Sequence, residues 1–321
     1  MTPRGTEAAA RPSPAEAGSS DSPTGRRRRR VANTAFDILG VVPGVVLIGG
    51  VTAYSATLLI VLSFQDASTF DVYGGQWVGF ETVTATLTSA ATQNALRNSI
   101  VWIVGSVFFV MALAIPLANY LRLETLPVRV SRAFMLIPWV LPGVVVAAIW
   151  RWAFSSQAGF INDALLRTGV IDQGRAWLGD PSTAIYAVMA VMVWRLFALV
   201  SLVLGAAMQT IDSEVEEAAA VDGASSIQAF TRIRIPMIKP HIYTMTLLSA
   251  IWVANNLVFV HAMTGGGPAN SSLILPIHIL RLGFSSFDMS SAAFVSVINV
   301  VVLLCFAAVY FRVTGFLRRD A

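Results

Sequence analysis

Charged residues are scarce in this sequence: Asp, Glu, Lys and Arg together make up 12% of its 321 residues. A soluble domain carries roughly 25%, so these charges are too few to cover a water-facing surface. Because 55% of the residues are hydrophobic, a chain that is disordered throughout is also excluded. The scarcity of charge therefore predicts an integral membrane protein and excludes a soluble globular enzyme.

Cysteine and lysine are nearly missing. The single cysteine, Cys305, excludes an internal disulfide and a cysteine-rich metal site. The single lysine, Lys239, precedes Pro240 and does not lie in a G-x-x-x-x-G-K-[ST] sequence, so the chain has no P-loop for ATP. The 3 histidines lack the spacing of metal ligands. We therefore expect no metal and no cofactor in this chain, and any hydrolysis of ATP falls to another chain.

Six apolar segments are long enough to cross a bilayer. A spanning helix needs about 20 apolar residues, and an open strand would leave its backbone groups unsatisfied in lipid. The segments are 38–63, 99–120, 133–153, 183–208, 241–262 and 291–311. They predict an all-α polytopic membrane protein with six transmembrane helices, the third of them kinked at Pro138 and Pro142.

The N-terminal residues differ from the rest in composition. Residues 1–33 are rich in Pro, Ser, Gly, Ala, Thr and Arg, which predicts a disordered tail before a transmembrane domain at 34–321. The next apolar run is too long for a signal peptide, so a retained helix is favoured. With the N-terminus inside, the inner segments hold 16 basic residues and the outer segments 4. This bias predicts a multi-pass protein of the cytoplasmic membrane with both termini in the cytoplasm. The composition of the tail favours a bacterial source.

The inner loop 209–240 has a helix–turn–helix pattern. Ser213 and Ser225 each stand three residues before a Glu or Gln, as in a capping box. Gly223 marks the turn between the two predicted helices, and Pro236 is expected to end the second. The second helix carries an apolar stripe that needs a covering partner. From the residues alone, a connector packed on its own membrane domain and a protein-docking element remain equally open.

The spacing within this loop resembles the EAA loop of binding-protein-dependent ABC importer permeases. The pattern is Glu-Ala-Ala, three residues, Gly, nine residues, then Ile-x-x-Pro. The resemblance implies that the loop docks in a cleft of an ATPase subunit and couples it to transport. The residues that carry this role by resemblance are Glu217, Ala218, Ala219, Asp222, Gly223, Ala224, Phe230, Ile233 and Pro236.

The chain from 36 to 315 is similar to MalF-like permeases of carbohydrate importers. The matching stretches are 98–99, 137–139, 150–152, 159–162, 177–180 and 264–268. The resemblance implies the type I ABC importer permease fold and import of a sugar or oligosaccharide by alternating access. The sequence after Trp194 departs from the family's usual Pro-Phe, and the large extracytoplasmic domain of the enteric maltose permease is absent. Both departures bear on the identity of the substrate.

The resemblance also implies partners. They are a second related permease subunit, an ATPase dimer that uses ATP and Mg²⁺, an extracytoplasmic sugar-binding protein and membrane lipid; no nucleic acid is expected. An intramembrane enzyme would need a cluster such as H-E-x-x-H or G-x-S-x-G, and neither is present. The EAA-like loop argues against a non-transporting scaffold. Arg195 keeps one alternative open, a permease for an anionic or phosphorylated polyol such as glycerol phosphate.

Polar residues within the fourth and fifth predicted spans mark a candidate substrate site, because such residues are costly in lipid. Ser249, Trp252 and Asn256 fall on one helix face, with Asn255 beside them. By resemblance, the positions that line the sugar site are Arg195, Leu199, Ser249 and Asn256. Two alternatives stay open: Arg195 pairs with the partner permease, or the Ser and Asn side chains only join helices.

Overall fold

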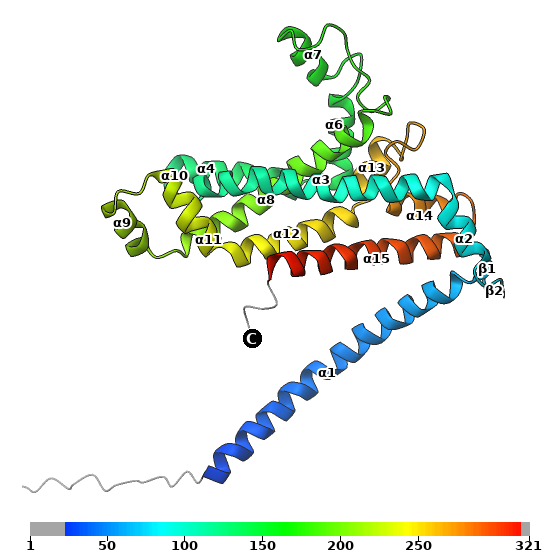
Figure 1. Ribbon diagram of the computed structural model, residues 1–321, viewed down its shortest axis with the longest axis horizontal. Coiled ribbons are helices and arrows are strands. Elements are labelled where there is room, and N and C mark those ends of the chain that lie inside the picture. Colours follow the sequence, from blue (N-terminus) through cyan, green and yellow to red (C-terminus); the bar gives the residue numbers. More distant parts are fainter. Residues whose placement is uncertain (1–22, 316–321) are drawn as a thin grey trace, which may run out of the picture. The chain divides into compact units, whose positions relative to one another are not determined.

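The computed structural model describes residues 23–315, and helices dominate this part of the chain (Figure 1). Residues 1–22 of the predicted tail and the last six residues lie outside the described part. Two compact units are distinguished, Met1–Thr57 and Leu58–Ala321, and each is described by itself. Helix α1 (Pro23–Leu62) begins within the range predicted as a tail and contains the first apolar segment.

The second unit contains a short hairpin and a series of helices. The hairpin pairs β1 (Gln65–Ser68) with β2 (Asp71–Trp77) in antiparallel register. The helices are α2 (Glu81–Thr88), α3 (Ala90–Leu121), α4 (Leu126–Met135), α5 (Ile137–Val140), α6 (Gly143–Ala153), α7 (Phe160–Arg167), α8 (Ala184–Gln209), α9 (Ser213–Val221), α10 (Ser226–Ala229), η1 (Phe230–Arg234), α11 (Ile235–Met237), α12 (Lys239–Ala254), α13 (Val258–Met263), α14 (Leu275–Phe284) and α15 (Met289–Thr314).

The apolar spans agree with the sequence prediction. Within residues 23–315, five stretches are long and apolar enough to cross a membrane: Val42–Leu62, Ala90–Leu121, Ala184–Gln209, Lys239–Met263 and Met289–Arg312. A sixth is formed if Leu126–Val140 and Gly143–Ala153, which meet at an angle of 96°, count as one broken span. The predicted kink is therefore confirmed. Pro142 precedes α6 and lacks the N–H that would continue the helix.

The prediction of an all-α chain missed the β1–β2 hairpin. The backbone N–H of Ala67 donates to Ser290 Oγ at 2.8 Å, and that of Thr69 donates to the carbonyl of Phe287 at 3.1 Å. These bonds fix the hairpin to the start of α15. The strands are short and do not alternate in hydrophobicity, so their periodicity did not reveal them.

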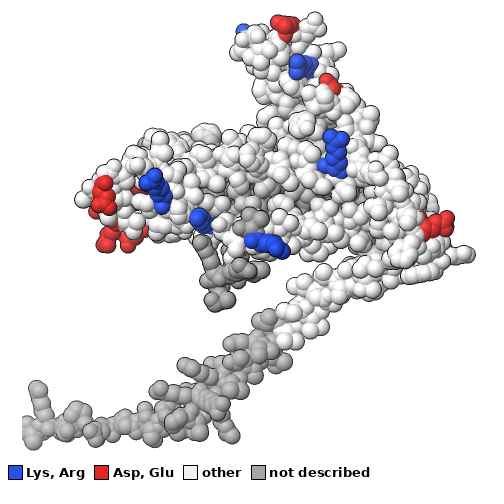
Figure 2. Space-filling model, viewed as in Figure 1, with Lys and Arg blue, Asp and Glu red and all other residues white. Residues whose placement is uncertain are grey.

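The core of the second unit lies mainly between α3 and α8, which pack along much of their length. Small residues allow the two backbones to approach closely. A Cβ added to Gly205 on α8 would lie 3.3 Å from the carbonyl oxygen of Ala118 on α3. Large side chains complete this core, among them Trp102, Val110, Leu196 and Leu204. Figure 2 shows that the face over α3 carries few charged side chains, as expected for contact with lipid or another apolar chain.

The fifth predicted span is two helices rather than one. Helix α12 ends at Ala254, and α13 begins at Val258. The indole N–H of Trp102, a fully buried residue, donates to the carbonyl of Val253 at 2.9 Å. This bond joins α3 to the end of α12. The prediction that Ser249 and Asn256 share one continuous helix face was therefore wrong.

Candidate functional site

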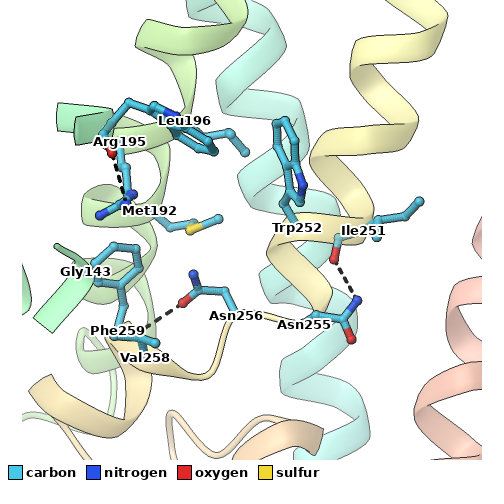
Figure 3. Close-up of a pocket in the computed structure, with 11 residues that line it drawn as sticks. Gly143, Met192, Arg195, Leu196, Ile251, Trp252, Asn255, Asn256, Val258 and Phe259 are labelled. Carbon is cyan, nitrogen blue, oxygen red and sulfur yellow. Dashed lines mark hydrogen bonds between the residues drawn. The ribbon is translucent and has the colours of Figure 1, made fainter. Parts of the chain in front are cut away.

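A cavity of about 430 Å³ opens between the broken helices. Its walls come from α5, α6, α8, α12, α13 and the segment that joins α12 to α13 (Figure 3). The volume falls in the range of small-molecule sites. The residues that line it are Trp139, Gly143, Met192, Arg195, Leu196, Ile251, Trp252, Asn255, Asn256, Val258 and Phe259.

Arg195 lies near the middle of α8 and reaches across to the break between α5 and α6. Its guanidinium donates to the carbonyl of Leu141 at 3.0 Å and to that of Trp139 at 3.3 Å. The guanidinium carbon lies 5.7 Å from the ring centroids of both Trp139 and Phe259. Carbonyls at a helix end lack intrahelical partners, so this side chain satisfies them. Arg195 therefore lines the cavity and also holds the broken span of its own chain.

Two asparagines stand at the break between α12 and α13. Asn255 donates its side-chain N–H to the carbonyl of Ile251 at 2.9 Å, and the side-chain oxygen of Asn256 accepts from the backbone N–H of Phe259 at 3.4 Å. Within the described residues, the side-chain oxygen of Asn255 and the side-chain nitrogen of Asn256 make no further hydrogen bond. Each amide therefore keeps one polar group free, and both residues are among those that line the cavity.

The cavity has an aromatic wall. The rings of Trp139 and Trp252 lie 5.4 Å apart, and each side chain is 36% exposed. Leu199 and Ser249, which were also predicted to line the site, are not among the lining residues. Ser249 is fully buried, and its hydroxyl has no hydrogen-bond partner in the described part of the chain. The structure thus gathers Arg195 and three of the five other predicted residues around one cavity.

Several lining residues were not anticipated as site residues. Met192, Val258 and Phe259 join the site because α8 passes beside α13, a contact that no local pattern reveals. Trp139 was noticed only as part of a matching stretch. Two signals in the sequence could have indicated these residues: the two prolines before α6 and the two adjacent asparagines. Both mark helix breaks, and a break inside a membrane is tolerated where its backbone is buried in protein or lines a cavity.

The loop 209–240 lies at one end of the bundle, where acidic side chains gather (Figure 2). Ser225 and Gln228 form the predicted capping box, with bonds of 2.8 and 3.3 Å. The first helix differs from the prediction, because Asp212 and not Ser213 is the N-cap residue. Its carboxylate accepts from the backbone N–H of Glu214 at 3.1 Å. Asp and Ser are both good N-caps, so the pattern alone did not choose between neighbours.

Pro236 does not end the second helix of the loop, contrary to the prediction. The chain continues through the π-helical turn η1 into α11, where Pro236 lies in the first turn. A proline is tolerated there because a first-turn residue needs no N–H for the helix. The π-helical turn η1 is wider than an α-helical turn, and it accommodates the proline that follows it.

The residues predicted to couple to an ATPase divide by exposure. Glu217, Ala218, Asp222, Gly223 and Pro236 are exposed, Ala219 is buried, and Ala224, Phe230 and Ile233 are half-buried. Gly223 has φ +77° with open space around it, as the predicted turn requires. Two apolar side chains nearby are strongly exposed, Val221 at 88% and Ile227 at 75%. A surface of this kind is suited to a protein partner.

Glu216 faces the other way, toward the bundle. Its carboxylate accepts two hydrogen bonds from Arg234, at 2.8 and 3.1 Å, and lies 3.1 Å from the guanidinium of Arg122. The bonds from Arg234, together with the charge of Arg122, hold the pKa of Glu216 below its usual value. Glu216 is therefore a link inside this chain, whereas Glu217 beside it is free for an external contact.

Apolar spans, two of them broken around a cavity whose lining includes Arg195 and two asparagines, define a multi-pass membrane transport subunit. The chain belongs to the family described as the binding-protein-dependent transport system inner membrane component, which its residues 110–320 match.

Relatives of this family match most of the chain. The sulfoquinovosyl glycerol transport system permease protein SmoG of Agrobacterium fabrum is 30% identical over 86% of this chain and 89% of its own length. A probable ABC transporter permease protein of Brucella suis is 32% identical over 72% of this chain and 80% of its own length. The diacetylchitobiose uptake system permease protein DasB of Streptomyces coelicolor is 27% identical over 90% of each chain.

A solved structure has the same fold. It belongs to a bacterial ABC transporter that imports the acidic polysaccharide alginate. The match covers 90% of this chain and 97% of the other, with a TM-score of 0.73 and 19% identity. The prediction of a type I ABC importer permease fold is confirmed.

Proposed function

We propose that this chain moves a sugar or oligosaccharide across the membrane by alternating access, as one permease subunit of an ABC importer. The observation that carries the proposal is the cavity at two helix breaks, because its lining suits a saccharide. The indoles of Trp139 and Trp252 offer flat apolar surfaces to the faces of sugar rings. The free amide groups of Asn255 and Asn256, with Arg195, offer polar partners for hydroxyl groups.

The relatives support a saccharide as the substrate class. Their names specify sulfoquinovosyl glycerol and diacetylchitobiose, and the solved neighbour imports alginate. A phosphorylated polyol has less support, since no relative named here carries one. In addition, Arg195 directs two hydrogen bonds to Leu141 and Trp139 of its own chain, which leaves fewer donors for a phosphate group.

The loop 209–240 is the proposed contact with the ATPase dimer. Glu217, Val221 and Ile227 are exposed there, and their burial in a cleft of an ATPase subunit would cover apolar surface at the end of the bundle. The ATPase hydrolyses ATP with Mg²⁺, since this chain carries no P-loop. The system also needs a second related permease subunit and an extracytoplasmic binding protein that delivers the sugar.

The bias of basic residues supports an orientation with both termini in the cytoplasm. The loop 209–240 then lies in the cytoplasm, and α7 lies outside. A cysteine at Gly169, which follows α7 in an open turn, should react with a membrane-impermeant reagent applied from outside. Tags at either end of the chain should be protected from the same side. Protection of residue 169 would contradict this orientation.

A matched pair of glycines tests the docking role. Gly223 in the loop and Gly169 after α7 have φ of +77° and +70°, and both are surrounded by open space. A valine is strained to a similar extent at each position, because β-branched residues avoid positive φ. Gly223→Val should weaken association with the ATPase and abolish uptake, whereas Gly169→Val should leave association unchanged. Equal association in the two variants would refute the docking role.

A further inference from the structure

A cluster of polar side chains joins the loop 209–240 to the end of α3. Arg234 is 7% exposed, and it donates through Nε and Nη2 to the two carboxylate oxygens of Glu216. Its third nitrogen donates to Asn119 Oδ1 at 3.0 Å. On the other side, Glu216 pairs with Arg122 at 3.1 Å. One carboxylate thus connects three segments: α9, η1 and the last residues of α3.

The geometry of the cluster makes this connection specific. Two parallel bonds between a guanidinium and a carboxylate fix direction as well as distance. Within the described residues, Glu216 is the only carboxylate paired with Arg234 or Arg122. Loss of that carboxylate would leave the buried guanidinium of Arg234 without its counter-ion, an arrangement that strongly disfavours the present packing.

The end of α3 is in turn joined to its neighbours. The side chain of Gln209, at the end of α8, donates to the carbonyl of Arg122 at 3.0 Å. Arg132 on α4 donates through Nε to the carbonyl of Leu121 at 2.8 Å. A displacement that reaches the end of α3 is therefore also applied to α8, the helix that carries Arg195, and to α4, which forms the first part of the broken span.

We propose that Glu216 transmits movement of the ATPase-docking loop to α3, and through α3 to the helices around the cavity. This inference rests on the proposed function of the loop. Glu216 acts as a positioning residue: it touches neither substrate nor ATP, and it holds α9 and η1 to the spanning helix as one body. Glu217 differs in role, because it is exposed and has no partner in the described part of the chain. The two adjacent glutamates face opposite ways, one toward the bundle and one toward the proposed partner.

The test compares Glu216→Gln with Glu217→Gln in the complete transporter, reconstituted in liposomes with its ATPase and binding protein. Both variants remove one negative charge from α9, so they are matched in position and chemistry. Three quantities are measured: association with the ATPase, the rate of ATP hydrolysis, and sugar transported per ATP hydrolysed. Glu216→Gln should keep association and lower the sugar-to-ATP ratio by about tenfold, within the usual range of coupling between two sites. Glu217→Gln should weaken association.

A second pair of residues gives an independent result. Arg122→Gln should also lower the sugar-to-ATP ratio, and the double variant with Glu216→Gln should be no worse than the more affected single variant, since both break the same ion pair. If Glu216→Gln does not reach the membrane, Asn119→Ala is judged by the same ratio, because it loosens Arg234 from α3 alone. A wild-type ratio in these variants overturns the proposal, as does loss of association equal to that of Glu217→Gln. Failure of the wild-type complex to couple would instead reject the proposed function.

Discussion

The guanidinium of Arg195 and the carbonyl oxygen of Leu141 lie 3.0 Å apart, across the break that separates α5 from α6. The same guanidinium reaches the carbonyl of Trp139 at 3.3 Å. A single side chain on the unbroken helix α8 therefore holds the bent span at its break and also forms part of the cavity wall. The shape of the cavity depends on this contact, so a movement of α8 should change the bend and the binding site together.

Arg195→Lys is expected to impair transport although it keeps the charge. A single ammonium group does not replace a planar group that binds two carbonyls at once. Loss of one charged hydrogen bond costs about 1.5–3 kcal/mol, so uptake should fall by about tenfold to a hundredfold. Initial rates of labelled sugar uptake, normalised to protein in the membrane, provide the measurement. Arg151→Lys on α6 is the control, because Arg151 is exposed and makes a single long bond of 3.5 Å. Wild-type uptake by Arg195→Lys would show that the contact is dispensable.

Asn256→Ala and Ser249→Ala should distinguish a residue that lines the cavity from one that is buried between helices. Asn256 lines the cavity and Ser249 does not. Removal of the amide leaves substrate hydroxyls unpaired, which costs about 1–3 kcal/mol, so uptake by Asn256→Ala should fall about fivefold or more. Ser249→Ala should transport like the wild type, because its buried hydroxyl has no partner in the described residues. Sugar affinity of the separate binding protein should be unchanged in both. The reverse order of effects would place the site beside Ser249 on α12 and away from the break at Asn256.

Trp102→Phe should destabilise the protein. The substitution keeps a large ring in the core but removes the bond from the indole N–H to the carbonyl of Val253. The loss is about 1 kcal/mol for a neutral hydrogen bond, or a Tm lower by roughly 2–4 °C. Thermal unfolding in detergent provides the measurement. Trp77→Phe is the matched control, because Trp77 is 67% exposed on the hairpin. An unchanged Tm for Trp102→Phe would mean that the join between α3 and α12 does not depend on this bond.

Attachment of the loop should be insensitive to moderate acid. The pKa of Glu216 is lowered by its bonds to Arg234, so it lies below the pKa in the unfolded chain. The contribution of the carboxylate is therefore fully present above the unfolded-state pKa, and it is lost as pH falls through the lower folded-state pKa. A spin label at Ile227→Cys reports loop mobility, in a Cys305→Ser background that removes the single native cysteine.

The label should stay restrained down to a pH below the usual range of a glutamate, and then become mobile. In Glu216→Gln it should be mobile at neutral pH. This variant also separates the effect of Glu216 from that of the other acidic residues of α9, which both proteins keep. Equal restraint in the two proteins at neutral pH would contradict the assignment of the link to Glu216.

Local patterns predicted the parts of the fold that are set by local chemistry. The span lengths follow from the length of the apolar segments, and the break at Pro142 follows from its missing N–H. The turn at Gly223 follows from the positive φ that glycine allows. The break at Asn255 was missed because asparagine is compatible with a helix, and the chain departs there through contacts with distant elements such as Trp102. The continuation through Pro236 was missed because the π-helical turn before it places the proline in the first turn of α11, where no N–H is needed.

The same division holds for the candidate site. Arg195 and Asn256 were predicted because a polar residue is costly in an apolar span and usually has a functional role. Phe259 and Met192 are ordinary apolar residues of apolar helices, and only the packing of α13 beside α6 and α8 brings them to the cavity. Leu199 and Ser249 satisfied the pattern, but the break in α12 and the course of α8 leave them outside the cavity wall.

Sugar accumulation in liposomes tests the central claim most directly. The chain is reconstituted with its second permease subunit and ATPase, with the sugar-loaded binding protein on the side opposite the ATPase. The account predicts accumulation that requires ATP and the binding protein, and that falls sharply in Asn256→Ala while the binding protein keeps its affinity. Accumulation without ATP, or none in the complete system with any saccharide that the binding protein holds, would contradict it.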